Sequence, residues 1–209
     1  MRPFLHSLAA PLVGLLVVLC ASGAAAPAGV ADVAPFFDAT QRRLVAISGT
    51  AAASRGPGCA ALVAELFDLA AVARSVAATD NWSVMPPPVR QRMRRAVATR
   101  FARECISLVD RADPAGARIV RVRERPGGVR MTVLAPDRQG LDRTIVWTLR
   151  PGSPQGGPPG GRRGWTATDL EADGRSVVSV LRHEFENSLL ARQGNVGEAV
   201  AHFSGMADR

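Results

Sequence analysis

The sequence contains no lysine and no tyrosine. All 26 of its basic residues are arginine, against 18 acidic residues, which gives a formal net charge of +8 over 209 residues. A basic excess of this size can indicate nucleic-acid binding. Here the absence of lysine accompanies many alanines, glycines and prolines, a composition typical of a GC-rich genome. The charge is therefore weak support for nucleic-acid binding.

Motifs that carry common chemistries are also missing. No C-x-x-C pair occurs, so the sequence supports neither a redox motif nor a zinc site. No glycine-rich loop joins a strand to a helix as a phosphate cradle requires. The histidines are His6, His183 and His202, and nothing around them has the spacing of a catalytic triad or a metal set. The sequence predicts no enzyme, no catalytic residue, no metal and no cofactor.

The first 26 residues have the pattern of a secretory signal peptide. Arg2 precedes an apolar run from Leu8 to Cys20, and small residues suited to cleavage follow. Leu19 is larger than the residue that usually precedes a lipidated cysteine, so lipidation of Cys20 is the minor alternative. An exported chain meets little nucleic acid, so we expect no nucleic-acid partner. Its charge favours anionic lipid headgroups or an acidic docking surface.

Removal of the signal would leave two cysteines, Cys59 and Cys105. Two cysteines in an exported protein are more often paired than free. A disulfide between them would restrict the unfolded chain by roughly 4 kcal/mol in the entropy model. Two buried thiols are the alternative.

Residues 27–209 are expected to form one domain, and helical periodicity dominates its first half. A helix is predicted over 32–52, with an apolar stripe formed by Val33, Phe37, Leu44 and Ile47. The glycines and proline at 54–58 are expected to end it. Asp68 can cap a later helix. Pro86–Pro88 can start a long helix that reaches about Val109. Its other faces carry arginines, which fit a solvated surface or, alternatively, a basic surface toward a membrane or a partner: Arg90, Arg92, Arg94, Arg95, Arg100 and Arg103.

Alternating apolar residues indicate strands in the second half. Strands are predicted over 118–124, 129–135 and 143–150. The run from Pro151 to Gly164 is rich in proline and glycine, which predicts a flexible insertion.

A strand, a turn and a long helix complete the chain. The strand begins at Trp165, and the turn at Asp173–Gly174 leads into a helix that starts at Ser176. Gly194 is expected to cap this helix, and Asn195 to cap a last short one.

This final unit resembles the carboxy-terminal signature of the MlaC, or toluene-tolerance, family of periplasmic phospholipid carriers. The signature combines a tryptophan strand, a Gly-x-Ser turn and a helix with an arginine and a phenylalanine, and its positions hold Trp165, Asp169, Gly174, Ser176, Arg182 and Phe185. A second block, from Phe67-Asp68-Leu69 through Arg74 and Val76 to Trp82, is similar to the same family. Here the family's Leu-Gly and Tyr before the tryptophan are missing, and three prolines replace one.

The resemblance implies an α+β fold in which helices wrap a curved, mostly antiparallel sheet of about four strands around an apolar pocket. The pocket would hold the acyl chains of a phospholipid. It would be bordered by the apolar residues Phe67, Val72, Val76, Trp82, Val97, Phe101, Val133, Trp147, Leu170, Val178, Leu181 and Phe185. We expect the pairs Val97–Phe101 and Leu181–Phe185 to face the sheet. Asp169 and Arg182 are expected to form a buried pair that shapes the fold.

The resemblance also implies a role and partners. A periplasmic carrier of this family passes lipid between an inner-membrane ABC transporter complex and an outer-membrane lipoprotein complex, and contributes to outer-membrane lipid asymmetry. We expect a monomer with bound lipid as cargo. Alternatives are a carrier of hopanoid or another polycyclic lipid, a small-molecule enzyme on a similar fold, and a basic adaptor that carries no ligand.

Overall fold

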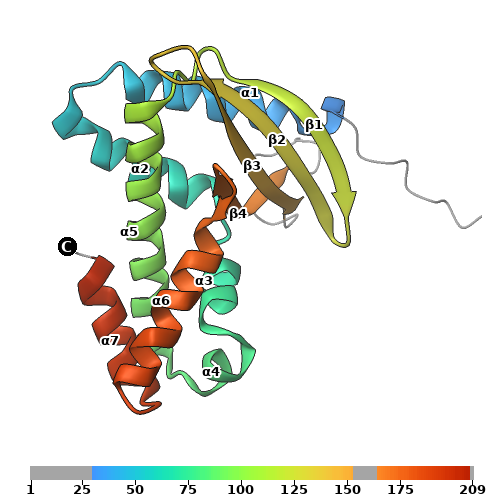
Figure 1. The fold of residues 1–209 in the computed structure, drawn as a ribbon. Coiled ribbons are helices and arrows are strands. Elements are labelled where there is room, and N and C mark those ends of the chain that lie inside the picture. The colour runs from blue at the N-terminus through green and yellow to red at the C-terminus, as the bar shows by residue number, and fades with distance from the viewer. Residues whose placement is uncertain (1–29, 153–163, 208–209) are drawn as a thin grey trace, which may run out of the picture.

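The computed structural model describes residues 30–152 and 164–207. The expected signal peptide at 1–26 and most of the expected insertion at 151–164 lie outside these ranges. The described residues form seven helices and a five-stranded sheet. Figure 1 shows the sheet at one end of the molecule and a group of helices at the other, with one long helix running between them. The predicted α+β class is confirmed.

The sheet follows the chain order and is antiparallel throughout. Its strands are β1 (Arg118–Arg125), β2 (Gly128–Pro136), β3 (Asp142–Pro151), β4 (Trp165–Ala172) and β5 (Arg175–Ser176). The prediction of about four strands missed β5, which has two residues. Between β1 and β2, Gly127 has a φ of 79°, which a glycine after Pro126 can adopt in a tight turn.

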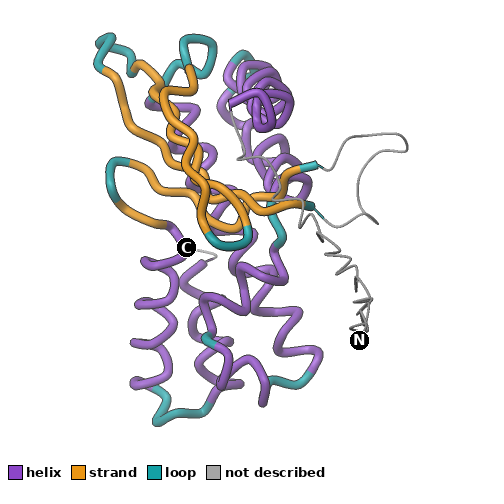
Figure 2. Tube along the Cα trace, turned by 90° about the vertical axis from the view of Figure 1, so that its right-hand side faces the viewer, coloured by secondary structure: helices purple, strands orange, loops and turns teal. Residues whose placement is uncertain are grey.

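One face of the sheet is apolar because the side chains of β2 and β3 alternate in direction. On β2, Val129, Met131, Val133 and Ala135 are buried, while the residues between them are partly exposed. Met131 lies opposite Trp147 of β3, so the apolar face continues onto that strand. Figure 2, turned by 90°, shows helices beside the strands and further helices below them.

The first two helices are α1 (Val30–Ser48) and α2 (Ala52–Leu66). The prediction that residues 54–58 break the helix was wrong, because α2 begins before this run and continues through it. Tertiary contacts offset its weak helical propensity. Gly58 lets α2 approach α1 closely, since a Cβ atom there would lie 3.0 Å from Cγ1 of Ile47. Pro57 lies on the exposed side of the helix.

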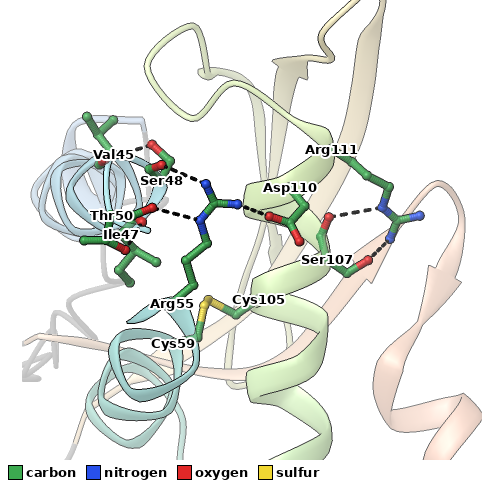
Figure 3. Close-up of polar contacts among 10 residues, drawn as sticks. All are labelled: Val45, Ile47, Ser48, Thr50, Arg55, Cys59, Cys105, Ser107, Asp110 and Arg111. Atoms are coloured by element: carbon green, nitrogen blue, oxygen red, sulfur yellow. Dashed lines mark hydrogen bonds and ion pairs between the residues drawn. A yellow bond between two sulfur atoms is a disulfide. The ribbon is translucent and has the colours of Figure 1, made fainter. Parts of the chain in front are cut away.

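Arg55 fixes the start of α2 against two other elements (Figure 3). Its guanidinium donates to the carbonyl oxygens of Ser48 and Thr50, each at 3.3 Å. It also forms an ion pair with Asp110 of the long helix α5 (Pro87–Arg111). One side chain thus joins the end of α1, the start of α2 and the end of α5.

A disulfide joins α2 to α5 one turn further on (Figure 3). The Sγ atoms of Cys59 and Cys105 are 2.09 Å apart, and the two residues are separated by 46 positions in the sequence. Because Cys59 is completely buried and Cys105 nearly so, the bond lies inside the core. It holds α2 against α5 beside the sheet.

The remaining helices are α3 (Leu69–Ala77), α4 (Thr79–Val84), α6 (Val177–Ala191) and α7 (Val196–Ala207). The predicted caps are confirmed. Asp68 accepts a hydrogen bond from the amide of Ala71 at 2.8 Å, and Gly194 follows α6 with a φ of 83°. Asn195 accepts one from the amide of Glu198 at 3.2 Å. Within residues 30–152 and 164–207, no helix is long and apolar enough to cross a membrane.

The disulfide yields the first prediction. Loss of the Cys59–Cys105 bond should lower the free energy of unfolding by roughly 4 kcal/mol, because the unfolded chain regains the entropy of the open loop. Chemical denaturation of the oxidised and reduced protein measures the difference. Alkylation without reductant, followed by peptide mapping, should leave both cysteines unlabelled. Full labelling of both thiols would contradict the bond.

Candidate functional site

An apolar cavity of about 50 Å³ lies between α1, the C-terminal end of α5 and the apolar face of the sheet. The sheet contributes side chains from β2 and β3: Met131, Val133, Ala135, Ile145 and Trp147. These side chains point toward the helices because they occupy alternate strand positions. The floor of the cavity is therefore built from hydrocarbon and one indole ring.

Helix α1 forms the opposite wall. It contributes residues spaced along one helical face: Phe36, Phe37, Thr40, Gln41 and Leu44. The Thr40 hydroxyl is satisfied within the helix, because it donates to the carbonyl oxygen of Phe36 at 2.8 Å. Gln41 is the other polar side chain of this wall. Neither side chain titrates, so α1 supplies no acid, base or metal-binding charge to the cavity.

Gln41 joins α1 to the connection between α5 and β1. Its amide nitrogen Nε2 donates to the carbonyl oxygens of Pro114 and Ala117, each at 3.0 Å, and to that of Ala115 at 3.3 Å. Pro114 and Ala117 also line the cavity. A single side chain thus closes the edge of the cavity between α1 and this connection.

Contacts with β4 and β3 hold the N-terminal half of α1 on the same face of the sheet. The indole nitrogen of Trp165 on β4 donates to the carbonyl oxygen of Asp32 at 2.7 Å. The ring of Phe36 meets that of Trp147 edge to face, with 5.9 Å between their centroids. An exposed ion pair of Arg43 with Glu65, at 2.8 Å, adds a contact with α2. Such an exposed pair contributes little to stability.

The structure divides the residues that were expected to border the pocket. Val133 and Trp147 line the cavity. Phe67 lies beside it, with its ring 5.8 Å from that of Trp147 and 4.6 Å from that of Phe101 on α5. These aromatic rings run from the cavity into the core.

The other expected pocket residues belong to the core among the helices and β4. Those that are buried there are Val72, Val76, Val97, Leu170, Val178, Leu181 and Phe185. Phe185 packs on Phe203 of α7, with 5.9 Å between ring centroids, so this part of α6 packs against another helix. Trp82 is half-buried, and the guanidinium of Arg90 lies 5.6 Å from its ring centroid.

The expected pair of Asp169 and Arg182 does not form. Asp169 accepts hydrogen bonds from the hydroxyl of Ser176 at 2.7 Å and from the amide of Val178 at 3.2 Å, so its carboxylate caps the start of α6. A carboxylate is favoured there by the unpaired amides of the first helical turn. Arg182 is exposed and donates to the carbonyl oxygen of Ser75 at 3.0 Å, near the C-terminal end of α3.

The α1 wall is the part of the cavity that the sequence prediction missed. Phe37 and Leu44 belong to the apolar stripe expected for this helix, so the periodicity held the required signal. A helical stripe shows that a face is buried, but it does not show against which layer it packs. Among the residues that the structure describes, no group of histidine, cysteine or carboxylate side chains could hold a metal ion.

Comparison with solved structures identifies a similar fold. It is that of a phospholipid-binding protein from Ralstonia solanacearum, determined in complex with a phospholipid. The TM-score is 0.63 at 13% sequence identity, and the match covers 86% of this chain and 98% of that one. The expected MlaC-like fold is thus confirmed. No family description and no curated protein matches the sequence.

Gln41 yields the second prediction. Gln41→Met keeps the length of the side chain but removes the donor shared by three carbonyl oxygens. The free energy of unfolding should fall by about 1–2 kcal/mol, and amide hydrogen exchange in α1 should accelerate. Gln91→Met on the exposed face of α5 is the matched control and should change stability by less than about 0.5 kcal/mol. Equal effects of the two variants would show that Gln41 does not hold α1.

Proposed function

We propose that this protein is a lipid carrier that holds acyl chains beneath α1, in an enlarged form of the apolar cavity. The observation that carries the proposal is a cavity walled almost wholly by hydrocarbon on this fold. The solved protein of similar fold from Ralstonia solanacearum was determined with a phospholipid. Thr40 and Gln41 use their polar groups elsewhere, so the cavity suits a chain without polar atoms, and the lipid headgroup stays outside.

The cavity must widen to take a lipid. Its volume of about 50 Å³ is far below the roughly 300–1,000 Å³ of pockets that hold drug-sized ligands. The strands of the floor are bound to one another along their length, and the disulfide fixes α2 to α5. Helix α1 has neither a strand ladder nor a disulfide. It is held by side-chain contacts, those of Gln41, Trp165 and Phe36 near the sheet and those that Arg43 and Arg55 make between α1 and α2. We therefore assign the opening movement to α1.

A carrier of this kind needs no catalytic group. Two acyl chains contain on the order of 30 methylenes, each worth about 0.8 kcal/mol out of water. Spontaneous release into water would be extremely slow, whereas transfer between two apolar sites has a small net free energy. Lipid should therefore pass by contact with membrane proteins. By the resemblance, these are an inner-membrane ABC transporter complex and an outer-membrane lipoprotein complex, with the carrier in the periplasm.

Lipid analysis gives the third prediction. Extraction of the natively purified protein, followed by mass spectrometry, should yield bound lipid and distinguish a phospholipid from a polycyclic lipid. Leu44→Trp places a larger ring on the cavity side of α1 and should lower the lipid content severalfold. Leu44 is only partly buried, so the fold should tolerate the change.

Leu181→Trp is the matched control. Leu181 is 1% exposed within the core around α6. A tryptophan there should overpack the core and lower the free energy of unfolding by about 1–3 kcal/mol, while the lipid content of the folded protein stays the same. Absence of lipid from the unmodified protein would refute the carrier. Loss of lipid only in Leu181→Trp would place the site around α6 instead.

A further inference from the structure

A row of arginines lies on the face of the sheet opposite the cavity. Arg121, Arg123 and Arg125 occupy alternate positions of β1, so their side chains leave the same side of the strand. Val122 lies between them and pairs with the buried Met131, whose side chain points into the cavity. The three arginines therefore point outward, and all are exposed. We call them the arginine row.

Three cationic side chains lie together in the arginine row. Glu124 of β1 lies opposite the buried Val129 of β2, so its side chain leaves the strand on the cavity face and not on the face of the row. The nearby acidic side chains bind other arginines: Asp142 pairs with Arg118 at 2.6 Å, and Glu171 pairs with Arg130 at 2.6 Å. The hydrogen bond and charge of Asp142 raise the pKa of Arg118. Among residues 30–152 and 164–207, no ion pair connects the arginine row to a carboxylate.

The arginine row adds electrostatic repulsion to the sheet, so folding by itself does not explain it. Arg123 lies directly opposite Arg130 of β2, and like charges at such positions destabilise a sheet. Charge on an edge strand such as β1 can prevent unwanted strand pairing. That role is served by any charge along the edge and does not require three arginines on one face of the strand. Arg125 instead reaches across the outer face and donates to Oγ1 of Thr148 at 3.5 Å.

We propose that the arginine row docks the protein on an anionic phospholipid bilayer. Arginine is always charged, and its planar guanidinium binds phosphate oxygens with two parallel hydrogen bonds. Hydrogen bonds with β2 fix the backbone of the row, so its three guanidinium groups can meet one plane of headgroups together.

The arginines of α5 are less suited to bind a flat layer of lipid headgroups together. Arg92, Arg94 and Arg95 are exposed, but successive helical residues turn by about 100° about the axis, so these side chains diverge. None of the arginine row lines the cavity. Docking is therefore separate from lipid carriage and can be tested apart from it.

Vesicle sedimentation tests the docking surface. The purified protein should sediment at low salt with phosphatidylcholine vesicles that contain phosphatidylglycerol, and much less with phosphatidylcholine alone. About 1 M NaCl, which shortens the Debye length to about 3 Å, should release it. The combined variant Arg121→Gln, Arg123→Gln, Arg125→Gln should lose about fivefold in partitioning per arginine, on the order of 100-fold in total. Its lipid content should match that of the unmodified protein.

The matched control is Arg92→Gln, Arg94→Gln, Arg95→Gln, which removes the same charge from α5 and should change partitioning only slightly. An equal loss in both variants would mean that net charge alone drives adsorption, and would overturn the proposal. Failure of the unmodified protein to bind anionic vesicles would also overturn it, and would leave an acidic protein as the partner. If the row variant fails to fold, Arg123→Gln alone should still lose about fivefold, and the corresponding triple lysine variant should retain most of the binding.

Discussion

The packing of α5 against both halves of the molecule is the constraint on which the rest of the fold depends. Beside the sheet, α5 is bonded to α2 through Cys105 and lines the cavity with Leu108 and Val109. Toward the other end, Met93 and Val97 are completely buried among the helices. Its 25 residues form one uninterrupted helix. Because a helix satisfies its backbone hydrogen bonds internally, it acts as a stiff rod. The position of the sheet relative to the helical end is therefore set by α5.

Against this rigid frame, the cavity is a gap in the helical cover over the apolar face of the sheet. An unfilled apolar space of about 50 Å³ costs about 1 kcal/mol in lost contacts. The core around α6 and α7 shows the opposite condition, since Phe185 and Phe203 pack closely there and are almost inaccessible. Movement of α1 would expose residues that already border the empty space. Movement of α6 would break the tighter packing of the helical end. We therefore expect the helix that borders the cavity, α1, to be the one that moves.

The sequence predicted the elements better than it predicted their partners. Asp68, Gly194 and Asn195 were found as caps because a cap depends on residues within one turn. The run at 54–58 was misread because its helix is stabilised from outside, by Arg55, by the disulfide and by the approach of α1 at Gly58. The same limit applies to the site. Apolar stripes on α5 and α6 could be found, but only the tertiary structure shows that α1 covers the cavity and that Asp169 caps a helix instead of pairing with Arg182.

Because side chains alternate along a strand, the cavity and the arginine row lie on opposite faces of the sheet. Val122 and Met131 face the cavity side of the sheet, and the arginine row leaves its other face. A bilayer held by the row would therefore not touch α1 directly, and docking by itself would not open the cavity toward the membrane lipids. This geometry favours transfer through a partner protein over direct extraction from the bilayer. The row would keep the carrier at the membrane surface, while α1 stays free to move against a partner.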